Sequence, residues 1–411
     1  INSNQIIQYF KTAESVINND ILLEMFISLL EHSDANINQQ TLIALRDLNV
    51  LNQLDRISSQ IANFLTHQEN RVRESACRVL GKMGEKAATN EVIDKIISAI
   101  GDPESRVRSS ACWALGNMGE KTATNKVIDK LISALGDDDY RVKIGACWAL
   151  GKMGEKATTN RVIDKLISAL GDQDNSVRES ACEALDKMGE KAATNKVVDK
   201  LISALGDQEI RVRYSACEAL DKMGEKAATN EVIDKLVSAL GDQDNSVRES
   251  ACEALDKMGE KAATNKVVDK LISALGDQEI RVRYSACKAL GNMGEKAATN
   301  EVIDKIISAI GDPESRVRSS ACWALGNMGE KTATNKVIDK LISALGDDDY
   351  RVKIGACWAL GKMGEKATTN KVVDKLISAL GDQDNSVRES ACIALGKMGE
   401  KAATHEVIDK L

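Results

Sequence analysis

Apolar positions along most of the chain fall into two alternating helical patterns, and the stretch Asn125–Thr159 shows both. Its first part predicts an amphipathic helix with Asn125 as N-cap, because apolar residues recur at spacings of three and four: Val127, Ile128, Leu131, Ile132, Ala134 and Leu135. A second helix is expected from about Asp139 to Met153, with a core stripe of Val142, Ala146, Ala149, Leu150 and Met153. Gly136 and Gly154 are the expected helix ends, since glycine is the usual residue just past a helix C-terminus.

This 35-residue unit recurs without a gap from Asn90 to the C-terminus. One acidic position shows the register: Asp102, Asp137, Asp172, Asp207, Asp242, Asp277, Asp312, Asp347 and Asp382. A fixed period of this length is typical of a solenoid, in which stacked units share one core and no unit is a domain by itself. The chain has only two prolines and no alternating β-branched runs, which favours helices throughout. The sequence therefore predicts an all-α solenoid of stacked two-helix repeats.

The predicted array has three parts. Residues 1–54 contain degenerate, more polar copies, which we expect to cap the N-terminal end of the core. Residues 55–404 are expected to form ten repeats in one continuous solenoid, and residues 405–411 begin a truncated further repeat. Because the chain starts without Met and stops inside a predicted helix, we expect it to be a segment of a longer protein.

Composition narrows the possible chemistry. The formal net charge of −7 argues against nucleic-acid binding, and no apolar run reaches the roughly 18 residues of a membrane span. The ten cysteines fall one per unit, and stacked helices lie roughly 8–10 Å apart, beyond the Cα separation of about 7 Å that a disulfide allows. We therefore expect small, mostly buried free thiols and a reducing, cytoplasmic location. With three histidines and no CxxC pair, no metal site or cofactor is expected.

A turn of about 100° per residue separates the core stripe of the second helix from an opposite side. The positions on that side differ most between copies, whereas the core positions barely change, which is the pattern of a recognition surface. Trp and Tyr are preferred at binding surfaces, and the acidic centre formed by the glutamates with Asp186, Asp221 and Asp256 would attract a basic segment. The candidate partner-binding residues are Trp113, Tyr140, Ile144, Trp148, Glu179, Glu183, Tyr214, Glu218, Glu249, Glu253, Tyr284, Trp323, Tyr350, Ile354 and Trp358.

Explanations of this face that involve no binding function stay open. Residues 83–160 and 293–370 are identical, so the second aromatic patch is equally well explained as a duplication with no selected role. The acidic centre is also explained as a solvated face that keeps a long array soluble. No residue is expected to be catalytic: paired carboxylates such as Glu179 and Glu183 would need a desolvated pocket, and a nucleophilic cysteine is not needed ten times.

The repeat resembles a HEAT repeat, and more specifically the short HEAT-like units of phycobilisome lyases. The resemblance is carried by an apolar helix ending in L-x-D, followed by V-R-x-x-A-x-x-A-L-G, as in Leu170-Gly171-Asp172, Val177-Arg178, Ala181 and Ala184-Leu185. It implies a right-handed α-solenoid whose second helices line the concave surface, with ladders of the Asp172 and Arg178 type between units. Units with Lys143 or Lys353 at the arginine position would keep the charge but lose the planar fork.

Three functions are compatible with this sequence. The first is a non-enzymatic protein–protein interaction scaffold that binds a peptide, a helix or a protein domain on its concave face. The second, suggested by the resemblance, is a lyase-like chaperone or enzyme subunit that holds a tetrapyrrole. The third is a passive spacer between other domains. The expected partner is a protein or peptide, including one with a basic central segment, and neither nucleic acid nor a membrane; the oligomeric state stays open.

Overall fold

The computed structural model describes residues 26, 28–30, 32, 34–47 and 57–402, and these form helices with no strand among them. Contacts divide the chain into two compact units, Ile1–Ala204 (unit 1) and Leu205–Leu411 (unit 2). Most of the predicted cap, residues 1–54, and all of the predicted truncated repeat, residues 405–411, lie outside the described residues. The two units are described separately below.

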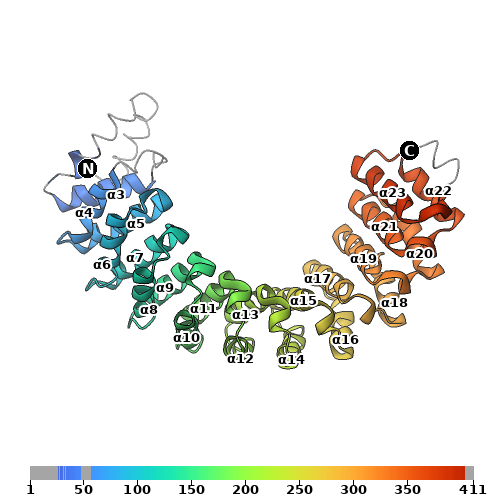
Figure 1. The fold of residues 1–411 in the computed structure, drawn as a ribbon, viewed down its shortest axis with the longest axis horizontal. Coiled ribbons are helices and arrows are strands. Elements are labelled where there is room, and N and C mark those ends of the chain that lie inside the picture. The colour runs from blue at the N-terminus through green and yellow to red at the C-terminus, as the bar shows by residue number, and fades with distance from the viewer. Residues whose placement is uncertain (1–25, 27, 31, 33, 48–56, 403–411) are drawn as a thin grey trace. The chain divides into compact units, whose positions relative to one another are not determined.

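Each unit is built from pairs of helices, shorter first helices alternating with longer second helices (Figure 1). The helices of unit 1 are α3 (Ala35–Asp47), α4 (Ser58–Asn63), α5 (Asn70–Met83), α6 (Asn90–Ala99), α7 (Ser105–Asn117), α8 (Asn125–Ala134), α9 (Tyr140–Met153), α10 (Asn160–Ala169), α11 (Asn175–Met188) and α12 (Asn195–Ala204).

The helices of unit 2 are α13 (Ile210–Met223), α14 (Asn230–Ala239), α15 (Asn245–Met258), α16 (Asn265–Ala274), α17 (Ile280–Asn292), α18 (Asn300–Ala309), α19 (Ser315–Asn327), α20 (Asn335–Ala344), α21 (Tyr350–Met363), α22 (Asn370–Ala379) and α23 (Asn385–Lys397). Short 3-10 helices, such as η6 (Gly154–Ala157), connect one pair to the next. The predicted all-α solenoid of two-helix repeats is thus confirmed.

The ends of these helices follow local chemistry. The sequence predicted Asn125 as the N-cap of α8, but Asn125 is the first residue of that helix. The N-cap is Thr124, whose extended backbone lets its hydroxyl accept a hydrogen bond from the N–H of Val127 at 3.4 Å. Asp139 caps α9 in the predicted place, accepting from the N–H of Arg141 at 2.9 Å. Gly154 ends α9 with a φ of 54°, which glycine adopts without strain.

The core lies between the two helices of each pair and between neighbouring pairs. The predicted stripe of α9 is fully buried, from Val142 to Met153. Within each unit, neighbouring second helices pack against one another much more extensively than neighbouring first helices do. They therefore form one close row inside each unit, with the first helices in a second row (Figure 1).

The cysteines lie in the contacts between second helices. All ten are free, and each is buried except Cys392, which confirms the prediction of free and mostly buried thiols. Burial disfavours the thiolate and raises the pKa of Cys112 to about 12. These side chains therefore act as small packing groups that let the helices approach closely.

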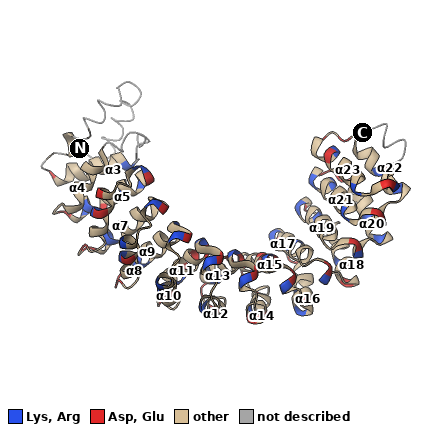
Figure 2. Cartoon of the chain, in the orientation of Figure 1, with Lys and Arg blue, Asp and Glu red and all other residues tan. Residues whose placement is uncertain are grey.

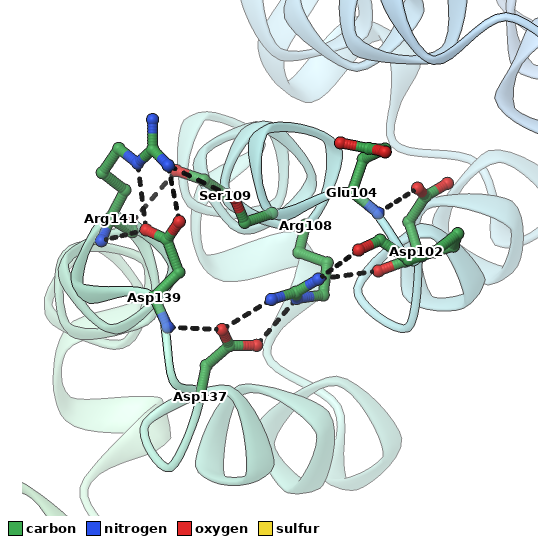
Figure 3. Close-up of polar contacts among 9 residues, drawn as sticks. Asp102, Glu104, Arg108, Ser109, Asp137, Asp139 and Arg141 are labelled. Atoms are coloured by element: carbon green, nitrogen blue, oxygen red, sulfur yellow. Dashed lines mark hydrogen bonds and ion pairs between the residues drawn. The ribbon is translucent and has the colours of Figure 1, made fainter.

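Consecutive repeats are also joined by ion pairs. Arg108 on α7 donates from Nε and Nη2 to the two carboxylate oxygens of Asp137, and from Nη1 to the carbonyl oxygen of Asp102 at 2.9 Å (Figure 3). Equivalent two-bond pairs join Arg73 to Asp102, Arg213 to Asp242, Arg248 to Asp277, Arg283 to Asp312 and Arg318 to Asp347. Lys143 instead makes one contact, from Nζ to Asp172 at 2.8 Å. The ladder expected from the family resemblance is therefore present, with the expected loss of the fork at lysine.

Candidate interaction surface

The side of the second helices that faces away from the core carries the predicted tyrosines. Tyr140 and Tyr350, the first residues of α9 and α21, are 47% and 48% exposed, and Tyr214 and Tyr284 are each 39% exposed. The guanidinium carbon of Arg141 lies 5.8 Å from the Tyr140 ring centroid. All four rings are therefore partly exposed on this side of their helices.

The tryptophans are not exposed in the way the sequence suggested. Trp113 and Trp148 are half-buried and stack on each other across two repeats, with ring centroids 4.1 Å apart and planes at 40°. Trp148 lies over Gly116: a Cβ built on that glycine would be 2.5 Å from Cζ3 of the indole. The space left by glycine therefore holds the ring against the neighbouring helix. Both indoles remain partly exposed, and the ammonium of Lys152 lies 5.4 Å from the Trp148 ring centroid.

The same arrangement occurs in unit 2. Trp323 and Trp358 stack at 4.2 Å and 41°, and the glycine beneath Trp358 is Gly326. Ile144 and Ile354, which also belong to the predicted surface, are half-buried. The aromatic patches are thus real clusters, and part of each ring stabilises the stack of repeats.

A groove of about 810 Å³ lies beside the tryptophans of unit 1, over α5, α7 and α9. Its lining is strongly basic, with Glu74 as the one acidic residue among Arg46, Arg78, Lys82, Arg106 and Arg141. Trp113 and Ser109 lie in the same wall, and the Ser109 hydroxyl donates to the backbone carbonyl of Arg141 at 3.0 Å (Figure 3). Sequence reasoning missed these basic residues. A feature of the sequence could have predicted the groove, because an arginine recurs at the second position of many second helices, including Arg106 and Arg141.

The predicted acidic centre is divided between the units. In unit 1 it consists of Glu179, half-buried, and Glu183, exposed, both on α11. In unit 2, Glu218 on α13 faces Glu249 and Glu253 on α15, and the Ser250 hydroxyl donates to Glu218 at 2.8 Å. Charged residues of both signs occur along these helices (Figure 2).

The carboxylates of unit 2 make one another's ionisation less favourable. Burial first, and then the charges of Glu249, Glu218 and Asp221, raise the pKa of Glu253 above its ordinary value. Burial also raises the pKa of Glu249, although Arg281 opposes the shift. This acidic surface therefore carries negative charge that its own basic neighbours only partly neutralise.

Some predicted far-side positions turn out to be packed between repeats. Asp221 and Asp256 are only 8% and 4% exposed, and Gly151 at the equivalent place in α9 is buried, because an added Cβ would lie 3.0 Å from Cα of Ala184. The neighbouring repeat covers this position, which the 100° projection of a single helix placed in solvent. Asp256 is satisfied there by the ammonium of Lys288 at 2.9 Å and the amide of Asn292 at 2.5 Å. These aspartates therefore belong to the repeat contacts rather than to the binding surface.

Chemical sites of other kinds are not formed by the described residues. No group of three His, Cys, Asp or Glu side chains among them is placed to hold a metal ion, and none of their helices combines the length and apolarity needed to cross a bilayer. The site built by this chain is thus a surface of aromatic rings, basic grooves and partly buried carboxylates.

Models of two known families of helical repeat proteins match this chain. The family model for HEAT repeats matches residues 268–341 and 338–411, and the model for the adaptin N terminal region matches residues 46–271, more than half of the chain. As a class, the molecule is therefore a HEAT-repeat protein. Its particular family is that of the adaptin N terminal region, to which the chain belongs. No curated protein sequence matches it significantly.

Several solved structures share the fold at low sequence identity. An engineered protein is 19% identical with a TM-score of 0.59, over 93% of this chain and 99% of its own. Kap95p bound to RanGDP is 17% identical with a TM-score of 0.60, over 99% of this chain and 58% of its own. The karyopherin Kap121p bound to the extreme C-terminus of the phosphatase Cdc14p is 18% identical with a TM-score of 0.52, over 97% and 49%. This chain thus spans about half the length of Kap95p and Kap121p, whose fold it shares.

Proposed function

We propose that this chain is a non-enzymatic scaffold that binds a protein or peptide along its second helices. The observation that carries the proposal is the contrast between a buried framework that repeats almost unchanged and one face where Tyr, Trp, Arg and Glu vary from copy to copy. Within each unit, the closer packing of the second helices supports placing this face on the concave side of that unit, because the tighter row of a curved stack lies inside the curve.

The related structures support a protein as the partner. Kap95p and Kap121p were each solved with a bound protein, RanGDP in one case and the C-terminus of a phosphatase in the other. Their similarity to this chain is one of fold, so we take from them only the use of a HEAT solenoid as a protein-binding surface. The bilin-lyase function and the spacer function stay alternative predictions; a pigment that absorbs visible light and co-purifies with the protein would favour the lyase.

The acidic surface of unit 2 suits a basic partner segment. Glu218, Glu249 and Glu253 lie on adjacent second helices. Burial first, and then repulsion between these carboxylates, raises the pKa values of Glu249 and Glu253, and a lysine or arginine from a partner would relieve that repulsion. The free, mostly buried thiols favour a reducing compartment such as the cytoplasm as the place where this binding occurs.

Site-specific crosslinking tests the scaffold. A photo-crosslinking amino acid replaces Tyr140 on the second-helix face, and the matched control carries it in place of Lys130, exposed on the first helix of the same repeat. We expect specific protein adducts from position 140 and few from position 130. The adduct is then identified by mass spectrometry, produced separately and bound to the purified chain.

The result that contradicts the proposal is equally direct. Adducts of equal identity and yield from both positions, or a purified adduct protein whose affinity is unchanged by Tyr140→Ala together with Trp148→Ala in a folded variant, would mean that the second-helix face does not bind.

A further inference from the structure

Unit 2 contains a second basic groove, and its surroundings differ from those of the first. It has a volume of about 760 Å³ and is lined by residues of α15, α17, α19 and α21. Four basic side chains line it, Arg281, Lys288, Arg316 and Arg351, against one acidic residue, Glu249. Tyr284, Trp323 and Ile354 give the same groove an apolar wall. The chain as a whole carries a net charge of −7. The local excess of positive charge in this groove is therefore opposite in sign to the charge of the whole chain.

The basic groups of this groove are only partly neutralised. Arg316 is exposed and makes no ion pair with the residues that the structure describes. Arg281 is exposed and reaches Glu249 only at 3.9 Å. Arg351 is held against Asp349 by two hydrogen bonds of 3.0 and 2.6 Å, which fixes its position near Tyr350. Two arginines are thus available to a ligand, and a third is held in place.

The two grooves share a pattern that duplication does not explain. At one position of the second helix, three consecutive repeats read base, Trp, Trp: Arg78, Trp113 and Trp148 in unit 1, and Lys288, Trp323 and Trp358 in unit 2. The tryptophans lie inside the identical segments 83–160 and 293–370, but Arg78 and Lys288 lie outside them, in repeats that differ from each other. A basic residue therefore precedes the tryptophan pair twice, by two different side chains.

We propose that the groove of unit 2 binds an acidic peptide segment in extended form, with carboxylates on Arg281, Arg316 and Arg351 and an apolar side chain against Trp323. The three arginines occupy the same position in consecutive second helices, and neighbouring helices lie roughly 8–10 Å apart. An extended chain in the polyproline II form has three residues per turn and rises about 3.1 Å per residue, so carboxylates at every third residue lie on one side, about 9 Å apart, and match this ladder. Arg281 and Arg316 suit such carboxylates because the planar fork of arginine donates two parallel hydrogen bonds. Arg351 offers its positive charge and its Nη1 group, because Asp349 already accepts from its Nε and Nη2.

This inference rests on the proposed function, because it assigns a partner chemistry to part of the second-helix face. It adds a second site, opposite in charge to the acidic surface. Nucleic acid is the other polyanion to consider. The groove favours a peptide because Glu249 lies in its wall and the acidic surface of Glu218 and Glu253 lies beside it, which would repel a continuous phosphate backbone.

Fluorescence anisotropy tests the proposal on the whole chain. The probe is a fluorescein-labelled peptide of about ten residues with glutamate at every third position and one leucine, spaced as the ladder requires. We expect saturable binding that weakens as salt increases. Replacing every glutamate by glutamine, or making Arg281→Ala with Arg316→Ala, should each weaken binding about ten-fold or more. Lys336→Ala together with Lys371→Ala removes the same charge from exposed first-helix positions, and we expect it to leave binding nearly unchanged.

Three outcomes would overturn the inference. They are equal affinity for the glutamate and glutamine peptides, equal weakening by the Lys336 and Lys371 control, and tighter binding of a single-stranded oligonucleotide of the same charge. Circular dichroism confirms that each variant is folded. Failure of the glutamate peptide with persisting Tyr140 crosslinks would reject the groove site and keep the scaffold; loss of those crosslinks would reject the scaffold by a separate measurement.

Discussion

Arg108 holds Asp137 of the next repeat through two parallel hydrogen bonds, Nε to Oδ2 and Nη2 to Oδ1, each 2.7 Å long. Both side chains are largely buried, at 18% and 15% exposure. Pairs of this type recur through both units and link one repeat to the next.

Removal of one partner should be costly. Arg108→Ala leaves Asp137 in a largely buried place without its fork, and we expect a loss of about 1–3 kcal/mol, since a buried charge is left without its partner. Arg108→Lys should cost less, because Lys143 fills the same position elsewhere with one bond. The measurement is the urea midpoint. Lys126→Ala, which breaks the exposed pair with Asp94, is the control and should change stability by less than about 1 kcal/mol.

The ladder also predicts an acid dependence of stability. Burial opposes ionisation of Asp137, but hydrogen bonds from Arg108 and from the N–H of Asp139 outweigh it and hold the pKa of Asp137 below its ordinary value. Its contribution to stability is therefore fully present above the unfolded pKa of about 4, and is lost as pH falls through the lower folded value. Asp137→Asn should be much less stable than the natural chain at pH 7. The gap should close below pH 4; a gap that stays constant would contradict this origin.

The acidic surface should behave in the opposite way. The raised pKa of Glu253 means that its ionised form destabilises the fold. Glu253→Gln should therefore stabilise unit 2 at pH 7, by up to about 1 kcal/mol after solvent screening. The advantage should shrink as pH falls through the raised pKa, because the natural side chain is then neutral. Glu389→Gln, an exposed glutamate on α23, is the matched control, and an equal gain there would contradict the prediction.

Gly116 should tolerate no side chain. An added Cβ would lie 2.5 Å from the Trp148 ring and 2.8 Å from Cα of Ala149, which is backbone that cannot move freely. Gly116→Ala should therefore lower the urea midpoint and shift the tryptophan fluorescence, although alanine favours helices by about 1 kcal/mol. Gly136→Ala meets only the carbonyl of Ser133 at 3.5 Å and is the control. Unchanged fluorescence in Gly116→Ala would contradict the predicted displacement of Trp148.

Thiol chemistry should separate one cysteine from the rest. Burial raises the pKa of Cys112 to about 12 and also raises the pKa of Cys77, whereas Cys392 is exposed. A thiol reagent should therefore modify one group quickly in the native chain and all ten after denaturation without reductant. Cys392→Ser should abolish the fast reaction. Fewer than ten thiols after denaturation would reject the argument for a reducing compartment.

The fold was predictable because the period repeats the same physics many times. The core stripe of α9 and the stop at Gly154 follow from spacing and side-chain chemistry alone. The link between Arg178-type and Asp172-type positions was expected from the resemblance to HEAT repeats. The capping residue was misassigned because Thr124 and Asn125 are both good caps, and only the backbone geometry decides between them.

The surface was less predictable, because exposure depends on the neighbouring repeat. A projection of one helix cannot show that Gly116 opens space for Trp148, nor that position 256 points into the next helix. The basic grooves were missed for a related reason. Arg281, Arg316 and Arg351 are distant in sequence and become a row only when the helices stack.

The two lysine rungs link their repeats with fewer hydrogen bonds than the arginine rungs do. Arg108 ties its carboxylate with two bonds and also grips two backbone carbonyls of its own loop, at Asp102 and Pro103. Lys143 and Lys353 each replace all of these with a single contact. Lys143 lies on α9 together with Trp148, and Lys353 lies on α21 together with Trp358. The joints that follow Lys143 and Lys353 therefore have fewer hydrogen bonds in their ion pairs than the arginine joints, and each lies directly beside a tryptophan pair.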